Sequence, residues 1–276
     1  TNTANLTLSS PRTTAGALTI YAGNIIAQQN LTTTNANAGI LLQATGYIEL
    51  AASRVLQTNR GNITFRSNSL GTAVVLPNVT TGSITLNSGS SLLSNGGNIT
   101  LGGNFTGTEG AGLYAASNRS GGSPGILINN ATLTAAGGNI NIYGKCNSSY
   151  DDGVRLQANI TTTGTGTIGI YGEAFGGNNG TQYFGGISFN NEISNIETDQ
   201  GNITLSGKLT NTQSNNTYGI NFYRSSGLAS QINHIQILSR TGAIQIIGDR
   251  GTTAAGGIGH SSWGNIYFGS PSNNSW

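Results

Sequence analysis

The chain has 276 residues, of which 36% are apolar and 7% are charged, and its formal net charge is +2. Its two lysines and nine arginines are scattered, so it lacks the clustered positive charge that nucleic-acid binding requires. It also lacks an apolar run of about eighteen residues, so the sequence predicts no membrane-spanning helix.

Glycine-led stretches of alternating apolar and polar residues recur along the chain. Residues 46–50, Gly-Tyr-Ile-Glu-Leu, are followed fifteen residues later by 61–65, Gly-Asn-Ile-Thr-Phe. Further pairs begin at Gly82 and Gly97, Gly125 and Gly138, Gly153 and Gly166, Gly186 and Gly201, and Gly219 and Gly242. Because side chains in a β-strand point alternately to opposite faces, each stretch is predicted to be a half-buried strand.

Another apolar signal precedes the second glycine of several pairs, which predicts three strands in each unit. It is formed by Leu56, Leu92, Leu133, Ile196 and Ile237. When the first glycine marks the start of a unit, the units begin at residues 16, 46, 82, 125, 153, 186 and 219, with a partial unit near Gly257. Spacings of 28 to 43 residues, about 34 on average, indicate a constant frame with loops of variable length between units.

The recurrence of similar strands predicts stacked coils rather than successive hairpins, which would not make every third strand alike. In a parallel β-helix, equivalent strands stack in register about 4.8 Å apart and their inward side chains form columns. The inward column of the third strand should contain Ile63, Ile99, Ile140, Ile168, Ile203, Ile244 and Ile266. The corner glycines, such as Gly96-Gly97 and Gly137-Gly138, should provide positive φ or close chain approach.

We therefore predict an all-β fold, a right-handed parallel β-helix (solenoid) of about eight coils of three strands. It should form a single β-helix domain over residues 1–276. Neither end of the sequence resembles a solenoid cap, so we expect a segment of a longer or polymerising protein. Self-association or end-to-end stacking of copies is expected for the same reason.

Asparagine recurs at an outward position at the start of the third strand. The residues are Asn62, Asn98, Asn139, Asn202 and Asn265. Stacked asparagines can hydrogen-bond along the axis of a solenoid as a ladder, and the structural role is the favoured interpretation. The alternative is an outward face that contacts a partner or another copy of the chain.

The strands of pattern Gly-(Asn/Ser/Thr)-Ile-x-(Leu/Ile/Phe), with their Gly/Asn corners, resemble the β-helical shafts of secreted bacterial exoproteins. The likeness is to filamentous-haemagglutinin-like adhesins of two-partner secretion and to autotransporter passengers, and it covers about residues 16–268. It implies an extracellular, non-enzymatic fibre and carries over no catalytic residue. The coil of about 34 residues is longer than is common in those shafts, and the N-terminal secretion domain of the family is not identifiable.

Asp151 and Asp152 are an adjacent acidic pair with a basic residue, Arg155, three positions after the second. Two carboxylates that flank a bond are what glycoside hydrolysis requires. However, no second acid lies at the equivalent place in adjoining units, and the motifs of the pectin-cleaving hydrolases of this fold are missing. We expect solvated turn acids here and predict no catalytic residue.

Metal and cofactor sites are not predicted. His234, His260 and the single Cys146 are too few and too far apart in the sequence for zinc. The glycine-rich run 176–180 lacks the aspartate of a calcium-binding nonapeptide, and no glycine-rich run continues into a phosphate-binding Gly-Lys-Ser/Thr. Cys146 is expected to be a small buried side chain.

Tyrosines and sequons are the remaining candidate binding features. Tyr143, Tyr171 and Tyr21 follow strands, and are expected to cover a corner of the core rather than to bind a sugar ring. Segment 174–183 is the predicted protruding loop. Four Asn-x-Ser/Thr sequons are candidate glycosylation sites: Asn104, Asn118, Asn147 and Asn179.

These features are consistent with three functions. The first is a non-enzymatic structural or adhesive rod or filament segment, extracellular or on the cell surface, that mediates attachment or self-assembly with host or cell-surface glycans as partners. The alternative is a carbohydrate-binding or polysaccharide-cleaving β-helix with its site near Asp151, Asp152 and Arg155. The third is a phage-type tail fibre, which would require a trimer.

Overall fold

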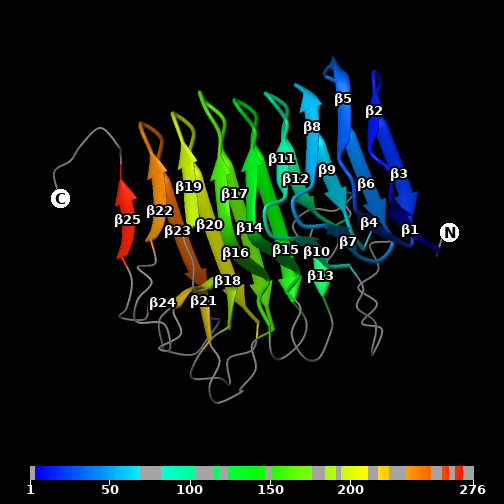
Figure 1. Ribbon diagram of the computed structural model, residues 1–276. Helices are drawn as coiled ribbons and strands as arrows, with labels where there is room; N and C mark the ends of the chain where they lie inside the picture. Colours follow the sequence, from blue (N-terminus) through cyan, green and yellow to red (C-terminus); the bar gives the residue numbers. More distant parts are fainter. Residues whose placement is uncertain are drawn as a thin grey trace.

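The computed structural model describes residues 4–68, 82–103, 115–117, 124–146, 151–175, 184–190, 194–210, 217–223, 234–249, 257–260 and 265–269. Every strand pairing within these residues is parallel. The strands form a 16-stranded and a 9-stranded sheet, stacked coil upon coil (Figure 1). The predicted all-β parallel β-helix is confirmed.

The described strands make eight complete coils and part of a ninth. The first four coils are β1 (Asn5–Leu8), β2 (Arg12–Thr14) and β3 (Leu18–Ala22); β4 (Asn24–Ala27), β5 (Leu31–Ala36) and β6 (Ile40–Ala44); β7 (Ile48–Leu50), β8 (Val55–Asn59) and β9 (Ile63–Arg66); β10 (Ile84–Leu86), β11 (Ser91–Leu93) and β12 (Ile99–Gly102). The next four are β14 (Ile126–Thr134) and β15 (Ile140–Cys146); β16 (Val154–Thr161) and β17 (Ile168–Ala174); β18 (Phe184–Asn190), β19 (Ser194–Thr198) and β20 (Ile203–Leu209); β21 (Thr217–Tyr223), β22 (His234–Ser239) and β23 (Ile244–Asp249). Then follow β24 (Ile258–His260) and β25 (Asn265–Gly269), while the short β13 (Ala115–Ser117) pairs with the end of β15.

First and second strands share the larger sheet because β14 and β16 each run through both positions without a break. The third strands form the smaller sheet, from β3 to β23. In β14 the register with β16 shifts between Asn129 and Ala131, and Asn130 between them has a positive φ of 48°. This β-bulge bends β14 at the place where other coils turn a corner.

Columns of apolar side chains fill the interior between the sheets. In the third strands the residues stacked in register, each at most 1% exposed, are Ile40, Ile63, Ile99, Ile140, Ile168 and Ile203. Ile244 continues this column and packs against the same core while partly buried. The predicted column is thus confirmed from Ile63 to Ile244, and one hydrophobic core runs through all eight coils.

The C-terminal members of the predicted third-strand columns are wrong. Strand β25 pairs with β22, a second strand, so that Ile266 lies beside Ile235 and Asn265 beside His234. Four residues separate β25 from the first strand β24, as they separate β7 from β8 and β10 from β11. Asn265 therefore does not belong to the asparagine series that begins at Asn62.

The predicted first unit, starting at Gly16, is also wrong. Gly16 precedes β3, which pairs with β6 in the sheet of third strands. Two short coils lie before Gly46 instead, with Asn24 only 19 residues beyond its partner Asn5. A coil of about 20 residues is therefore enough to close one turn, and the 34-residue average reflects extra residues inserted in later coils.

A column of glycines stands at the corner before the third strand. A Cβ atom built on Gly97 would lie 2.1 Å from the carbonyl oxygen of Gly61, and one on Gly138 would lie 2.0 Å from that of Gly97. Gly96 and Gly137 precede them with positive φ angles of 112° and 110°. The predicted corner role of these glycines is confirmed, because no side chain fits where adjacent coils approach so closely.

A second set of glycines brings the end of a third strand against the start of the following first strand. A Cβ on the first glycine of each pair would lie 1.9 to 2.2 Å from the carbonyl oxygen of the second. The pairs are Gly144 with Gly153, Gly172 with Gly186, Gly207 with Gly219, and Gly248 with Gly257. In the sequence Cys146 and Asp151 lie between Gly144 and Gly153, and both are buried.

Replacement of a column glycine should destabilise the whole stack. We expect Gly138→Ala to lower the free energy of unfolding by about 3 kcal/mol, because its methyl group would overlap the backbone of the preceding coil. Gly16→Ala is the matched control, since a Cβ there meets nothing within 4 Å. Thermal and urea unfolding followed by circular dichroism measure both, and equal stability of the two variants would contradict the close-packing argument.

Candidate functional site

The outward asparagines bond to the backbone of the adjacent coil. The backbone N–H of Asn98 donates to Oδ1 of Asn62 at 2.9 Å, and that of Asn139 donates to Oδ1 of Asn98 at 2.8 Å. Thr167 continues the series by donating to Asn139, and Ala243 donates to Asn202, each at 2.9 Å. In this series the side-chain oxygens accept hydrogen bonds from backbone N–H groups of the adjacent coil. These oxygens are therefore already hydrogen-bonded within the solenoid.

A column of buried hydroxyl groups accompanies the glycine column, and the sequence analysis missed it. Thr58 donates to the carbonyl oxygen of Gly61 at 2.6 Å, and Thr198 donates to that of Gly166 at 2.8 Å. The other members are Thr33, Ser94, Thr162 and Ser239. The signal was present in the sequence as a Ser or Thr that usually lies three residues before the corner glycine.

Asp151 and Asp152 are buried, so the expectation of solvated turn acids is wrong. Their side chains are 0% and 2% exposed, and both bind Arg155. Arg155 donates from Nη2 to Oδ1 of Asp151 at 2.6 Å and from Nε to Oδ2 of Asp152 at 2.7 Å. Oδ1 of Asp152 also accepts bonds from the backbone of Gly185, at 2.8 Å, and the hydroxyl of Ser188, both in the next coil.

The electrostatics of this cluster are unbalanced. Two carboxylates share one guanidinium, and Oδ2 of Asp151 is buried with no hydrogen-bond partner among the described residues. Burial raises the pKa of Asp151 to about 7, and the charge of Asp152 adds to the rise while Arg155 opposes it. With Asp151 buried and Asp152 fully bonded inside the protein, neither carboxylate is placed to reach a polymer in solvent.

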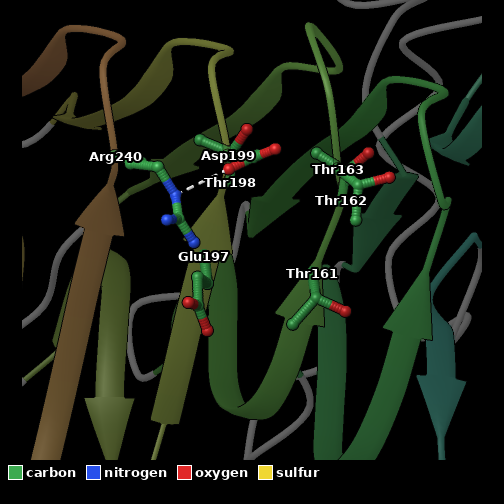
Figure 2. Close-up of a pocket in the computed structure, with 7 residues that line it drawn as sticks. All are labelled: Thr161, Thr162, Thr163, Glu197, Thr198, Asp199 and Arg240. Carbon is green, nitrogen blue, oxygen red and sulfur yellow. Dashed lines mark ion pairs between the residues drawn. The ribbon is translucent and has the colours of Figure 1, made fainter. Parts of the chain in front are cut away.

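A polar depression of about 350 Å³ lies where β16, β19 and β22 end (Figure 2). It is lined by Thr161, Thr162, Thr163, Glu197, Thr198, Asp199 and Arg240. Arg240 Nε lies 2.8 Å from Oδ1 of Asp199, with the two side chains 58% and 37% exposed. In Figure 2 a dashed line joins Arg240 to Asp199, Glu197 lies near the far end of the guanidinium, and Thr161, Thr162 and Thr163 lie on the neighbouring coil.

The depression occupies a local departure from the repeat. In the seventh coil the corner glycine, Gly201, is the third residue after the buried hydroxyl of Thr198. In the sixth coil Gly166 is the fourth residue after Thr162, and Gly164 between them has a positive φ of 56°. The extra residue lengthens this turn, whose first exposed residue is Thr163, on one side of the depression.

The tyrosines lie on the outer face of the smaller sheet, so the expectation that they cover a corner of the core is wrong. Tyr143 in β15 and Tyr171 in β17 are stacked with ring centroids 4.9 Å apart and planes 8° from parallel. The ring of Tyr171 leans over Gly169, where an added Cβ would lie 2.8 Å from its Cε2. Tyr21 is 58% exposed on β3.

Several positions that the sequence analysis singled out lie outside the described residues. The sequons Asn104, Asn118, Asn147 and Asn179 and most of segment 174–183 fall outside. Cys146 is buried, as expected. Among the described residues no group of three His, Cys, Asp or Glu is arranged to hold a metal ion. The same residues include no helix that is long and apolar enough to cross a membrane.

Comparison of the chain with protein-family models, with curated proteins and with solved structures found no match in any of the three.

The buried cluster makes stability depend on pH. Because the pKa of Asp151 is raised above its ordinary value of 3.8, the folded protein holds a proton between about pH 4 and pH 7 that the unfolded chain releases. The contribution of this group to stability should therefore fall as the pH rises through that range. Asp151→Asn should flatten this part of the profile, as measured by urea unfolding at several pH values between about 4 and 8.

Asp152→Asn is the contrasting variant at the same site. It removes the carboxylate that accepts bonds from Arg155, Gly185 and Ser188, and we expect it to cost about 3 kcal/mol or more. An Asp151→Asn profile as steep as that of the wild type would contradict the assignment of the proton to Asp151.

Proposed function

We propose that the chain is a rigid shaft segment of an extracellular structural or adhesive protein, and that it performs no catalysis. The observation that carries the proposal is the unbroken axial stack, in which three strand positions and one apolar core run through eight coils. A solenoid of this kind transmits load along its axis through backbone hydrogen bonds. Its use as a spacer requires no internal site.

The outer surface supports the same proposal. The outward positions of the third strands carry mostly neutral polar residues, among them Thr64, Thr100, Asn141 and Thr204. Charged residues make up only 7% of the chain. A polar but weakly charged rod is suited to fixed contacts with neighbouring copies or with surface glycans, which we propose as its partners, rather than to the binding of nucleic acid.

Membership in the filamentous-haemagglutinin-like or autotransporter shafts is part of this proposal. It rests on the glycine-led strand pattern and on the parallel coils that the pattern predicted. The two short coils that contain Asn5 and Asn24, with a repeat of 19 residues, remove one objection to it, because the basic turn is shorter than the 34-residue average.

Carbohydrate binding is the second candidate function. Polysaccharide cleavage at Asp151 and Asp152 has little geometric support, because both carboxylates are buried and bound to Arg155. The accessible depression around Glu197 and Asp199 favours binding instead, since it exposes carboxylate, hydroxyl and guanidinium groups together.

The location of the protein tests the main proposal. Antibodies raised against the purified chain should label the surface of intact producing cells, or material shed from them, in immunogold electron microscopy. The expected label lies on fibres or on a surface layer, because a shaft holds other parts of a protein away from the cell. Label that appears only after the cells are lysed would refute the extracellular assignment.

The solution mass separates the shaft from a trimeric tail fibre. Sedimentation over a range of concentrations should give a single chain, or a mass that rises gradually with concentration as copies stack. The unit should have the mass of one 28.2 kDa chain. A stable mass of three chains at all concentrations would favour the tail fibre and contradict the shaft.

A further inference from the structure

We propose that the depression around Glu197, Asp199 and Arg240 is a binding site for a neutral or amino-bearing saccharide of one or two rings. This inference deepens the proposed adhesive function and rests on it for its biological setting.

The depression brings three charged residues together, as the cluster of Asp151, Asp152 and Arg155 does, but here the paired side chains are partly exposed. The 276 residues include 11 basic and 9 acidic residues, and three of these line this one depression. At the register positions equivalent to Glu197, preceding coils carry Gln57, Leu93, Thr134 and Thr161. Glu197 is therefore not a product of the repeat, which places neutral residues at this position in the preceding coils.

The polar groups are held in place by neighbours. Asp199 is paired with Arg240 at 2.8 Å, and one oxygen of Glu197 lies 3.3 Å from Nδ2 of Asn195. The Thr161 hydroxyl lies 3.2 Å from that of Thr134 on the preceding coil. Side chains fixed in this way lose less conformational freedom when a ligand binds.

The chemistry of the lining matches adjacent hydroxyl groups on a sugar ring. An ionised carboxylate accepts hydrogen bonds at both oxygens, a guanidinium only donates, and a threonine hydroxyl does both. Glu197 and Asp199 would thus accept from sugar hydroxyl or amino groups, while Arg240 would donate to ring or hydroxyl oxygens. Hydrogen bonds to charged groups are stronger than those between neutral groups, which favours binding of a ligand at a site open to solvent.

Other ligand classes fit less well. A phosphate, sulfate or uronate would meet two carboxylates and one guanidinium, so like charges would repel it. A bare divalent cation would meet the positive charge of Arg240 between its would-be ligands. The lining also contains no aromatic or aliphatic residue on which an apolar ligand could be buried.

The volume limits the size of the ligand. About 350 Å³ is near the lower end of the range for small-molecule pockets, about 300 to 1,000 Å³. That space suits one or two sugar rings, and a longer glycan would extend onto the open surface.

The test is a titration of the full chain with defined disaccharides. Lactose, N,N′-diacetylchitobiose, the disaccharide of glucosamine and digalacturonic acid are compared by saturation-transfer NMR and isothermal calorimetry. We expect at least one neutral or amino disaccharide to bind and digalacturonic acid to bind more weakly than it. The double variant Glu197→Gln, Asp199→Asn should weaken that binding by about tenfold or more, since charge-assisted bonds are lost.

Glu49→Gln is the matched control, because Glu49 is a partly buried outer-face carboxylate on β7, far along the stack from the depression. It should bind the disaccharide as the wild type does, and circular dichroism should show that all variants remain folded. Absence of binding by every saccharide would overturn the proposal. So would equal binding by the double variant, or preference for digalacturonic acid. None of these results would affect the shaft assignment, which is tested by surface labelling and solution mass.

Discussion

Close approach of adjacent coils at the corner glycines is the constraint on which this structure depends. Where Gly138 faces Gly97, the two backbones leave no room for even a methyl group. Contact at this distance fixes the height of one coil above the next and prevents the strands from sliding. The register of the isoleucine column, of the buried hydroxyl groups and of the outward asparagines follows from it. Each of these columns then adds bonds that the fixed height makes possible.

A fixed register makes local insertions visible as features of the surface. The bulge at Asn130 is absorbed within β14, because the strand continues in pairing on both sides of it. The extra residue between Thr162 and Gly166 is accommodated by a longer turn, and a depression lies beside it. In a repeat that uses its interior entirely for packing, such departures are the places where side chains can be arranged for a ligand. The candidate binding site lies at one of them.

The sequence was sufficient to predict the fold because its strongest signal, apolar alternation after glycine, is the signal that the core uses. It was insufficient to separate first, second and third strands, which share that alternation, and so Gly16 and Asn265 were placed in the wrong sheets. The burial of Asp152 could not be predicted from the sequence either. Its partners Gly185 and Ser188 lie 33 and 36 residues away, in the next coil. Loop lengths alone do not reveal which distant groups such a residue will meet.

The buried cluster and the depression lie at opposite ends of β16 and are connected through it. Asp152, just before this strand, holds the sixth coil to the seventh through Gly185 and Ser188. Thr161, at the end of the strand, pairs with Glu197 of the seventh coil in the depression. Between these ends β16 changes partner from β18 to β19, and the offset between paired residues changes from 33 (Leu156 with Phe189) to 36 (Asn159 with Asn195). The buried cluster therefore holds the pairing of β16 with β18, whereas the pairing of β16 with β19 sets how Thr161 and Glu197 lie side by side in the depression.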